Sequence, residues 1–279
     1  MEWRLASALC LTGMVVLGAV LASASEQRGR TRIAAHRGGA LLWPENSLLA
    51  FENALKLGVA FLECDVHLTR DGEVVVLHDA TLDRTSTGRG AVGELTLNGI
   101  RRVRLRSGPE AVPIDQAPPT LGDLLSLAAG RAQLLVEIKP SQNGLYQGIE
   151  ERVLALLESH QMLADTLVMA FDPTYLERLR ALHPTVRLGG LLSARQVSKG
   201  RSVAALFDHV AAVKGAFVGL QYTLVDAEVM GMARQRGLMV GVWTVNDEGA
   251  MRRALELGVD ILISDRPDVA MELINANRP

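Results

Sequence analysis

Aromatic residues and net charge are both scarce in this chain. Phe, Trp and Tyr make up only 4% of its 279 residues, so its core must consist mainly of Leu, Val, Ile and Ala. Aliphatic residues of this kind suit parallel strands that are buried on both faces. The formal net charge is −2, and no run of like charges occurs. Because a basic patch is typical of nucleic-acid-binding proteins, we expect no nucleic-acid partner.

Cysteine is also rare, since only Cys10 and Cys64 occur. Cys10 lies in an apolar N-terminal run and follows Leu9, whereas a lipid-attachment cysteine needs a small residue there, so we do not predict a lipoprotein. If this run is removed, Cys64 has no partner for an internal disulfide. Free cysteine usually packs as a small apolar side chain, and we expect Cys64 to be buried.

The N-terminal segment has the pattern of a secretory signal peptide. Residues 5–24 contain no charge, Arg4 lies directly before them, and Ala22-Ser23-Ala24 provides the small residues of a cleavage site. We therefore predict a signal peptide over residues 1–24 and an exported protein, either periplasmic or secreted. The alternative is an uncleaved membrane anchor, because the run is about long enough to span a bilayer.

The rest of the chain alternates short β-rich runs with longer helical patterns, which is typical of repeated βα units. Eight runs are predicted as strands: Arg32–His36, Ala60–Leu68, Gln133–Lys139, Thr166–Phe171, Val186–Leu191, Ala216–Gln221, Leu238–Thr244 and Asp260–Ser264. Eight such units without a long linker favour a closed TIM (β/α)8 barrel, formed by a single domain over residues 31–279. An open sheet would need a dinucleotide or phosphate fingerprint after its first strand, and no G-x-G-x-x-G occurs there.

Apolar residues at helical spacing predict the helices between these strands. The predicted helices are Ser47–Leu57, Gln147–Ser159, Pro173–Leu182, Asp226–Arg236 and Asp247–Leu257. Asp247 is placed as an N-cap, and Gly58, Gly237 and Gly258 follow helices where positive φ is needed. The segment Thr85–Pro119 does not follow the alternation of predicted strands and helices. We expect it to form a small insertion after the second strand, and Val74–Leu77 to form a short extra strand.

Three carboxylates stand out on the predicted strands. Glu63 and Asp65 are two residues apart and point to the same side of a strand, and Glu137 lies on the next strand. Two carboxylates on one buried face repel each other and lose hydration, which is unfavourable unless a cation compensates them. Oxygen ligands of this kind suit Ca²⁺ or Mg²⁺. The alternative is a solvent-facing pair neutralised by Arg70 or Arg84.

Histidine is the second candidate residue type, because imidazole titrates near neutral pH and can act as an acid or a base. His36 and His78 begin loops next to the carboxylates, beside Arg37 and Asp79. His67 faces the same way as Glu63 and Asp65, but we expect it to form a structural hydrogen bond. The remaining histidines lie at or near helix ends, where a structural role is ordinary: His160, His183 and His209.

Several short blocks follow one another along the chain: His36-Arg37-Gly38-Gly39, Pro44-Glu45-Asn46-Ser47, Glu63-Cys64-Asp65-Val66, His78-Asp79, Arg84-Thr85, Thr87-Gly88, Glu137-Ile138-Lys139, Trp243-Thr244-Val245-Asn246 and Ser264-Asp265-Arg266-Pro267. Together these blocks, in this order, resemble the glycerophosphodiester phosphodiesterase family. The resemblance covers roughly Ile33 to Leu273. One block alone would be weak, but the whole set is specific.

The resemblance implies a TIM barrel that hydrolyses glycerophosphodiesters, a small-molecule substrate, to glycerol 3-phosphate and an alcohol. It further implies one role for each of nine residues: His36 and His78 as the acid/base pair, Glu63, Asp65 and Glu137 as ligands of a divalent cation, Arg37 and Lys139 on the phosphate, Glu45 in the site region and Trp243 beside the glycerol. The nucleophile would be water, or the glycerol 2-hydroxyl through a cyclic phosphate. Membrane contact is expected only through the leader or a lipid-derived substrate.

Two other classes of function remain open. The same site would serve a lysophospholipase D or a lyase that forms cyclic phosphates. A non-catalytic barrel that binds a phosphorylated ligand or acts as an adhesin would be expected to lack one of the histidines or carboxylates, and none is missing.

Overall fold

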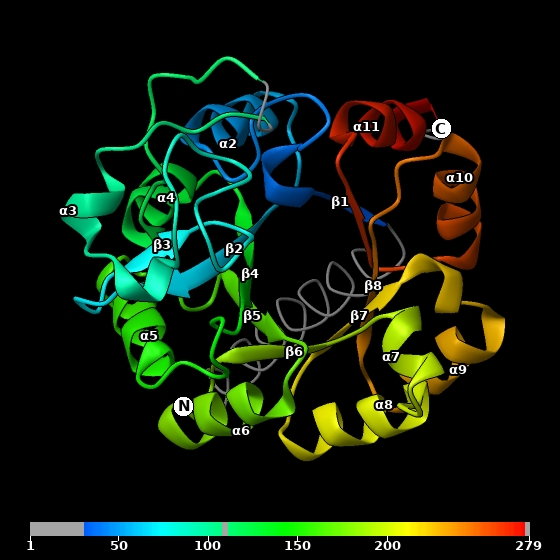
Figure 1. Ribbon diagram of the computed structural model, residues 1–279. Coiled ribbons are helices and arrows are strands. Elements are labelled where there is room, and N and C mark those ends of the chain that lie inside the picture. Colours follow the sequence, from blue (N-terminus) through cyan, green and yellow to red (C-terminus); the bar gives the residue numbers. More distant parts are fainter. Residues whose placement is uncertain (1–30, 108–110, 277–279) are drawn as a thin grey trace, which may run out of the picture.

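The computed structural model describes residues 31–107 and 111–276, and eight parallel strands of this part close into a barrel (Figure 1). The barrel strands are β1 (Arg32–Ala35), β2 (Phe61–Leu68), β4 (Gln133–Ile138), β5 (Thr166–Ala170), β6 (Arg187–Leu192), β7 (Phe217–Gln221), β8 (Met239–Trp243) and β9 (Ile261–Ser264). Strand β1 pairs with β9 on one side and with β2 on the other, which closes the sheet. Each strand begins and ends within one residue of a predicted run, so the predicted TIM barrel is confirmed.

Helices cover the outside of the barrel (Figure 1). Five of them match the predicted segments: α2 (Leu48–Lys56), α5 (Ile149–Ser159), α6 (Pro173–Leu182), α9 (Ala227–Gln235) and α10 (Glu248–Leu257). Five more were not predicted: α3 (Leu97–Ile100), α4 (Leu121–Ala128), α7 (Ala194–Ser198), α8 (Val203–Ala212) and α11 (Pro267–Ala276). Asp247 caps α10 as expected, by accepting a hydrogen bond from the Ala250 N–H at 3.0 Å. Gly58, Gly237 and Gly258 have positive φ angles of 78°, 68° and 69°.

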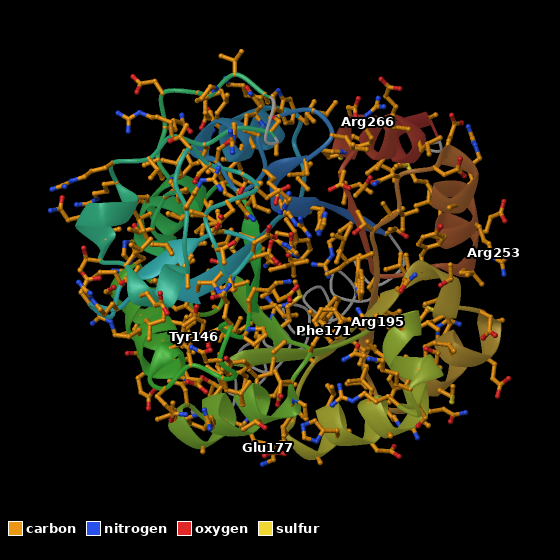
Figure 2. All side chains as sticks on the ribbon, in the orientation of Figure 1. Tyr146, Phe171, Glu177, Arg195, Arg253 and Arg266 are labelled. Carbon is orange, nitrogen blue, oxygen red and sulfur yellow. The ribbon has the colours of Figure 1, made fainter. Side chains whose placement is uncertain are left out.

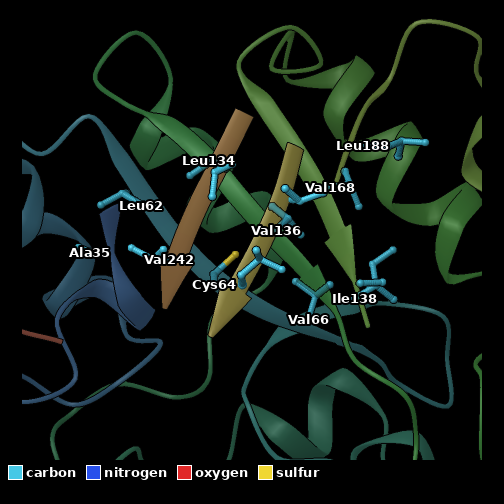
Figure 3. Packing of buried hydrophobic residues seen from close by; sticks show 14 of the residues in the cluster. Ala35, Leu62, Cys64, Val66, Leu134, Val136, Ile138, Val168, Leu188 and Val242 are labelled. Atoms are coloured by element: carbon cyan, nitrogen blue, oxygen red, sulfur yellow. The ribbon is translucent and has the colours of Figure 1, made fainter. Parts of the chain in front are cut away.

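The alternation of side chains on each strand separates two cores. Leu62, Cys64 and Val66 of β2 point outward and pack between the barrel and its helices, together with outward residues of β4 (Figure 3). Cys64 is a free, buried cysteine, as predicted. The inward core is smaller, and Phe217 fills part of it. A Cβ atom added to Gly189 or Gly241 would lie within 2.5 Å of its ring, so these glycines make room for it.

The insertion after β2 forms a small lobe beside the barrel. Strand β3 (Val74–Val76) pairs antiparallel with β2, and the 3-10 helix η2 (Val92–Glu94) and α3 follow it. A separate apolar cluster holds the lobe together: Val75, Leu77, Leu82, Val92, Ile100 and Leu105. The predicted extra strand and insertion are both found.

The leader predicted over residues 1–24 lies outside the described residues, and the assignment of residues 31–279 to one catalytic domain stays a prediction. In the described part of the chain, no helix is long and apolar enough to cross a membrane.

Candidate active site

Three carboxylates meet inside the barrel at the ends of β2 and β4. Glu63 and Asp65 point inward from β2, and Glu137 lies beside Asp65 on β4, because the register pairs these two residues. All three are buried, and one oxygen atom from each lies within 4.8 Å of the others. Among the described residues, this is the one group of acidic, histidine or cysteine side chains with metal-binding geometry. The predicted ligands therefore lie together, facing the barrel interior and not solvent.

The burial and the mutual repulsion of these three carboxylates favour the binding of a cation. Burial and the neighbouring charge of Asp65 raise the pKa of Glu63 to about 8. Burial also raises the pKa of Glu137. Although burial acts to raise the pKa of Asp65 as well, the charges of Lys139 and Arg37 outweigh it and lower that pKa. Three buried carboxylates thus face Arg37 and Lys139, and the raised pKa of Glu63 favours its protonated form. A metal ion that binds here would have to displace that proton.

Lys139 and Arg37 are the two cations in contact with the carboxylates. The Lys139 Nζ lies 2.7 Å from Glu137 Oε1 and 3.3 Å from Asp65 Oδ1. The Arg37 Nε lies 3.3 Å from Asp65 Oδ2, but it has no hydrogen-bond partner although it is buried. Both side chains line the cavity described below. Each therefore points a positive group at the space above the carboxylates.

The backbone around Arg37 is held in a left-handed conformation. Arg37 has a φ of 50°, and Gly38 and Gly39 have φ angles of 82° and 102°. This turn brings the Arg37 N–H to Glu63, to which it donates a hydrogen bond of 2.9 Å. A Cβ atom on Gly38 would lie 2.7 Å from the Ala50 side chain, so only glycine fits. Strain in a non-glycine residue often marks a functional site, and here it serves to orient Glu63.

His36 directly follows β1 and is held by the carboxylate of Asp265, which directly follows β9. Its Nδ1 and Asp265 Oδ1 are 2.6 Å apart, and its Nε2 is 3.9 Å from Glu63 Oε2. Asn246 donates to the other oxygen of Asp265 at 2.8 Å and accepts from the Asp265 N–H at 2.9 Å. Burial acts to lower the pKa of His36, but the charge of Glu63 and the Asp265 hydrogen bond outweigh it and raise that pKa.

His78 lies across the site in a similar arrangement. Its Nδ1 and Asp79 Oδ1 are 2.7 Å apart. Arg84 donates to both oxygens of Asp79 and, at 2.8 Å each, to both oxygens of Glu45. Burial lowers the pKa of His78. The two histidines therefore differ in proton affinity, although each binds a carboxylate through Nδ1.

Glu45 links the two sides of the site. Besides Arg84, it accepts a hydrogen bond of 3.1 Å from Arg37 Nη1. Burial acts to raise the pKa of Glu45, but the Arg84 hydrogen bonds and the Arg37 charge outweigh it and lower that pKa. Glu45 thus lies in the site region, as predicted, but its oxygens are engaged by two arginines.

His67 takes the structural role predicted for it. Its Nδ1 lies 3.1 Å from the Tyr146 hydroxyl, and its Nε2 lies 3.1 Å from the His78 carbonyl oxygen. Burial lowers the pKa of His67 to about 4, so the ring is neutral. The three remaining histidines lie on outer helices or at their ends and contact other outer groups.

A cavity of about 160 Å³ opens above the carboxylates and is called the catalytic cavity below. Its lining residues are His36, Arg37, Glu63, His78, Glu137, Lys139, Met169, Phe171, Leu191, Trp243, Thr244 and Ile263. Phe171 and Trp243 form an edge-to-face pair with ring centroids 5.4 Å apart. The Trp243 Nε1 is buried without a hydrogen-bond partner. Of the nine predicted site residues, seven line this space directly, while Asp65 and Glu45 contact residues that line it, Asp65 through Arg37 and Lys139 and Glu45 through Arg37.

Sequence reasoning gave no role to several residues that hold these groups in place. Asp265 and Asp79 bind the two histidines, and Arg84 joins Asp79 to Glu45. Asn46 donates to Asp65 at 3.0 Å. Arg84 therefore does not neutralise Glu63 or Asp65, which was the alternative explanation for the acidic strand. All four residues lie in the sequence blocks quoted above, but a sequence block does not show which side chain each residue contacts.

Comparisons with known proteins agree with this geometry. Residues 36–269 match the model of the glycerophosphoryl diester phosphodiesterase family. The chain is 32% identical to a glycerophosphodiester phosphodiesterase of Bacillus subtilis, over 84% of this chain and 83% of that protein. It is 30% identical to a glycerophosphodiester phosphodiesterase of Caldanaerobacter subterraneus, over 88% and 98%. The crystal structure of a putative glycerophosphoryl diester phosphodiesterase from Agrobacterium tumefaciens superposes with a TM-score of 0.81, at 31% identity, covering 90% and 99% of the two chains.

Proposed function

The chain belongs to the glycerophosphoryl diester phosphodiesterase family, and from this we propose that it hydrolyses glycerophosphodiesters to glycerol 3-phosphate and an alcohol. One observation carries the proposal. Two histidines, each held by its own aspartate, line one small cavity together with Glu63 and Glu137, and Asp65 completes the group of three buried carboxylates. This arrangement offers a cation site and two proton carriers to the same bound phosphodiester.

We propose that Glu63, Asp65 and Glu137 hold a divalent cation. The donor set fits, because it consists of buried carboxylate oxygens within 4.8 Å of one another, which are hard ligands of the kind that Ca²⁺ and Mg²⁺ take. When bound, the cation would act as a Lewis acid that neutralises charge on the phosphoryl oxygens. The raised pKa of Glu63 supports the proposal, since burial and the charge of Asp65 disfavour a further negative charge that a cation would compensate.

We propose that His36 and His78 form the acid/base pair. Each ring binds a carboxylate through Nδ1, so Nε2 is the atom left to exchange a proton with substrate. One histidine accepts the proton of the nucleophile, and the other donates a proton to the leaving alkoxide. Such groups typically contribute 10²–10⁴-fold to a rate.

Arg37 and Lys139 are proposed to bind the phosphate oxygens. Both side chains line the cavity, where preorganised positive groups stabilise developing negative charge. Trp243 is proposed to pack beside the glycerol, and its unpartnered Nε1 can donate to a glycerol hydroxyl. Glu45 is proposed to position Arg37, because the two side chains share a hydrogen bond.

The proposed activity is tested by product analysis of the purified protein. We expect glycerol 3-phosphate from glycerophosphocholine, and EDTA in excess should abolish its release. Repeating the assay in ¹⁸O-labelled water shows whether solvent oxygen enters the phosphate. Labelled glycerol 3-phosphate indicates hydrolysis at phosphorus, either directly or through a cyclic phosphate that water opens, whereas accumulation of an unlabelled cyclic phosphate would indicate a lyase. Binding of glycerol 3-phosphate without turnover would contradict the proposal and favour a non-catalytic barrel.

Export is a further part of the proposal. The uncharged run over residues 5–24 and the small residues at its end support a cleaved leader, which would place the enzyme in the periplasm or outside the cell. N-terminal sequencing of the protein recovered from its native compartment tests this. A first residue near Ser25 supports cleavage, and an intact Met1 in the membrane fraction supports an anchor.

A further inference from the structure

His67 lies inside the barrel close to the site, and the proposed function gives it no part in the reaction. It follows Asp65 by two residues on β2, so its side chain also points inward, and only 1% of its surface is exposed. Burial of a polar ring is unfavourable unless its nitrogen atoms find hydrogen-bond partners. Both nitrogen atoms of His67 have a partner, and the two partners come from different loops.

The first partner is the backbone of His78. His67 Nε2 lies 3.1 Å from the His78 carbonyl oxygen. A carbonyl oxygen can only accept, so Nε2 carries a hydrogen atom and donates it. This carbonyl belongs to the peptide that joins His78 to Asp79. The hydrogen bond from His67 therefore holds the orientation of that peptide.

The orientation of this peptide decides whether His78 can bind Asp79. The two residues are adjacent in the sequence, yet His78 Nδ1 and Asp79 Oδ1 are only 2.7 Å apart. Neighbouring side chains meet in this way only when the backbone torsions on either side of their shared peptide are suitable. The Leu77 N–H binds a carbonyl oxygen of β2 at 3.0 Å, and Arg84 binds the Asp79 carboxylate. His67 holds the backbone between these two points.

The second partner of His67 is Tyr146, in the loop between β4 and α5. Figure 2 shows Tyr146 on the side of the barrel that carries α5. Its hydroxyl lies 3.1 Å from His67 Nδ1, and the two rings pack edge to face with centroids 5.8 Å apart. The Tyr146 N–H in turn donates to the hydroxyl of Tyr175, a fully buried residue of α6, at 3.0 Å. The His67 ring is thus fixed from both sides.

We propose that His67 is a positioning residue for His78, an inference that rests on the proposed role of His78 as a proton carrier. By holding the shared peptide, His67 keeps the His78 ring bound to Asp79 while Nε2 of that ring is left to exchange a proton with substrate. His67 itself does not line the catalytic cavity. Its loss should therefore lower kcat and leave KM nearly unchanged.

Two substitutions of His67 test the proposal. Leucine has no donor, whereas the side-chain amide of glutamine can present an N–H where the imidazole has Nε2. His67→Leu should lower kcat about 10–100-fold, with KM within about threefold of the wild type. His67→Gln should keep kcat within about threefold. His160→Leu is the matched control, because His160 also contacts a backbone carbonyl oxygen, that of Leu156, but on an outer helix. Full activity of His67→Leu, or equal losses in both His67 variants, would overturn the inference.

NMR of the His78 Nδ1 proton provides a readout that does not depend on turnover. The signal is assigned by its absence in His78→Ala. We expect it to be lost or shifted in His67→Leu and kept in His67→Gln, and an unchanged signal in His67→Leu would overturn the inference. If the wild type is inactive while this signal depends on His67 as expected, the proposed function fails and the contact between the two histidines stands.

A milder variant and a metal titration complete the experiment. Tyr146→Phe removes only the hydroxyl that contacts His67, so it keeps the test available if His67→Leu does not fold, and it should lower kcat about 2–10-fold. Mg²⁺ affinity of each variant should stay within about threefold of the wild type. Loss of Mg²⁺ binding in step with kcat would show that β2 as a whole is disturbed, and this would overturn the inference.

Discussion

The catalytic end of the barrel has a charged side and an apolar side. On the charged side, β2 and β4 carry Glu63, Asp65 and Glu137, and the segments after β1 and β3 add His36 and His78. On the apolar side, β5 and β6 contribute side chains such as Met169 and Leu191 to the same cavity. The backbone is a repeated βα unit on both sides, so this difference comes from side chains alone. The charged and the apolar side chains of this cavity therefore come from different strands.

The two sides also differ in what they contribute to stability. Apolar residues inside the barrel are buried at no electrostatic penalty, and their burial stabilises the folded state. The charged side gathers carboxylates that burial disfavours, and it depends on Arg37, Lys139 and a proton on Glu63 for compensation. We therefore expect substitutions on the two sides to separate activity from stability.

The largest effect should follow loss of either histidine on the charged side. His36→Ala and His78→Ala should each lower kcat by about 10²–10⁴-fold, because each removes a proton carrier, while the unfolding midpoint changes little. Release of glycerol 3-phosphate measures the rate. His160→Ala is a matched control, since His160 contacts the Leu156 carbonyl oxygen on an outer helix and should leave kcat unchanged. Full activity of His36→Ala would contradict the assignment of His36 to the acid/base pair.

The apolar interior should show the opposite behaviour. Phe217→Ala removes a buried ring that packs against Gly189 and Gly241, and should lower the free energy of unfolding by about 3–5 kcal/mol. Urea unfolding measures this loss, and kcat at low temperature should stay close to that of the wild type. Tyr222→Ala, at a position 40% exposed, serves as the control and should change stability by less than about 0.5 kcal/mol. A large fall in kcat for folded Phe217→Ala would mean that the two regions are not separable.

A smaller effect is expected from the residue that orients His36. Asp265→Asn keeps the size of the side chain but removes the charge that binds His36 Nδ1, and we expect a loss of about 10–100-fold in kcat. The pKa of His36 should fall at the same time, because the Asp265 hydrogen bond helps to raise it. NMR titration of the His36 ring measures this. An unchanged His36 pKa would show that Asp265 has only a structural role.

The smallest expected effect is a pH dependence of metal binding. The folded, metal-free protein keeps a proton on Glu63 up to about pH 8, whereas the unfolded chain releases it near its ordinary pKa of 4.5. Stability of the metal-free protein therefore falls as pH rises through this window. A cation must displace the proton, so its affinity should rise by up to about tenfold per pH unit and level off above about pH 8. Calorimetric titration with Mg²⁺ or Ca²⁺ checks this, and a flat affinity below pH 8 would contradict it.

Much of the fold was predictable because its signals are local. Each barrel strand is a short, largely apolar run, and all eight were placed within one residue. Helices α4 and α8 were missed although each begins after a capping hydroxyl, Thr120 and Ser202. The cap was visible in the sequence, but α8 is apolar around much of its surface and gives a weak helical pattern.

The candidate site was predictable in its residue types but not in its contacts. Spacing on β2 placed Glu63 and Asp65 on one face, and the barrel brought Glu137 beside them. No local pattern joins His36 to Asp265, because 229 positions separate them and only closure of the barrel between β1 and β9 brings them together. The cavity of about 340 Å³ between β6, α6 and α8 was not predictable for the same reason, since it depends on how these elements pack.

Coupling between metal binding and turnover tests the central claim most directly. Mg²⁺ or Ca²⁺ is titrated into metal-free protein while bound metal and glycerol 3-phosphate release are measured in the same samples. The site described here predicts one cation per chain, with activity rising in proportion to occupancy, and loss of both in Glu137→Gln. Full turnover by the metal-free protein, or unchanged metal binding by Glu137→Gln, would contradict it.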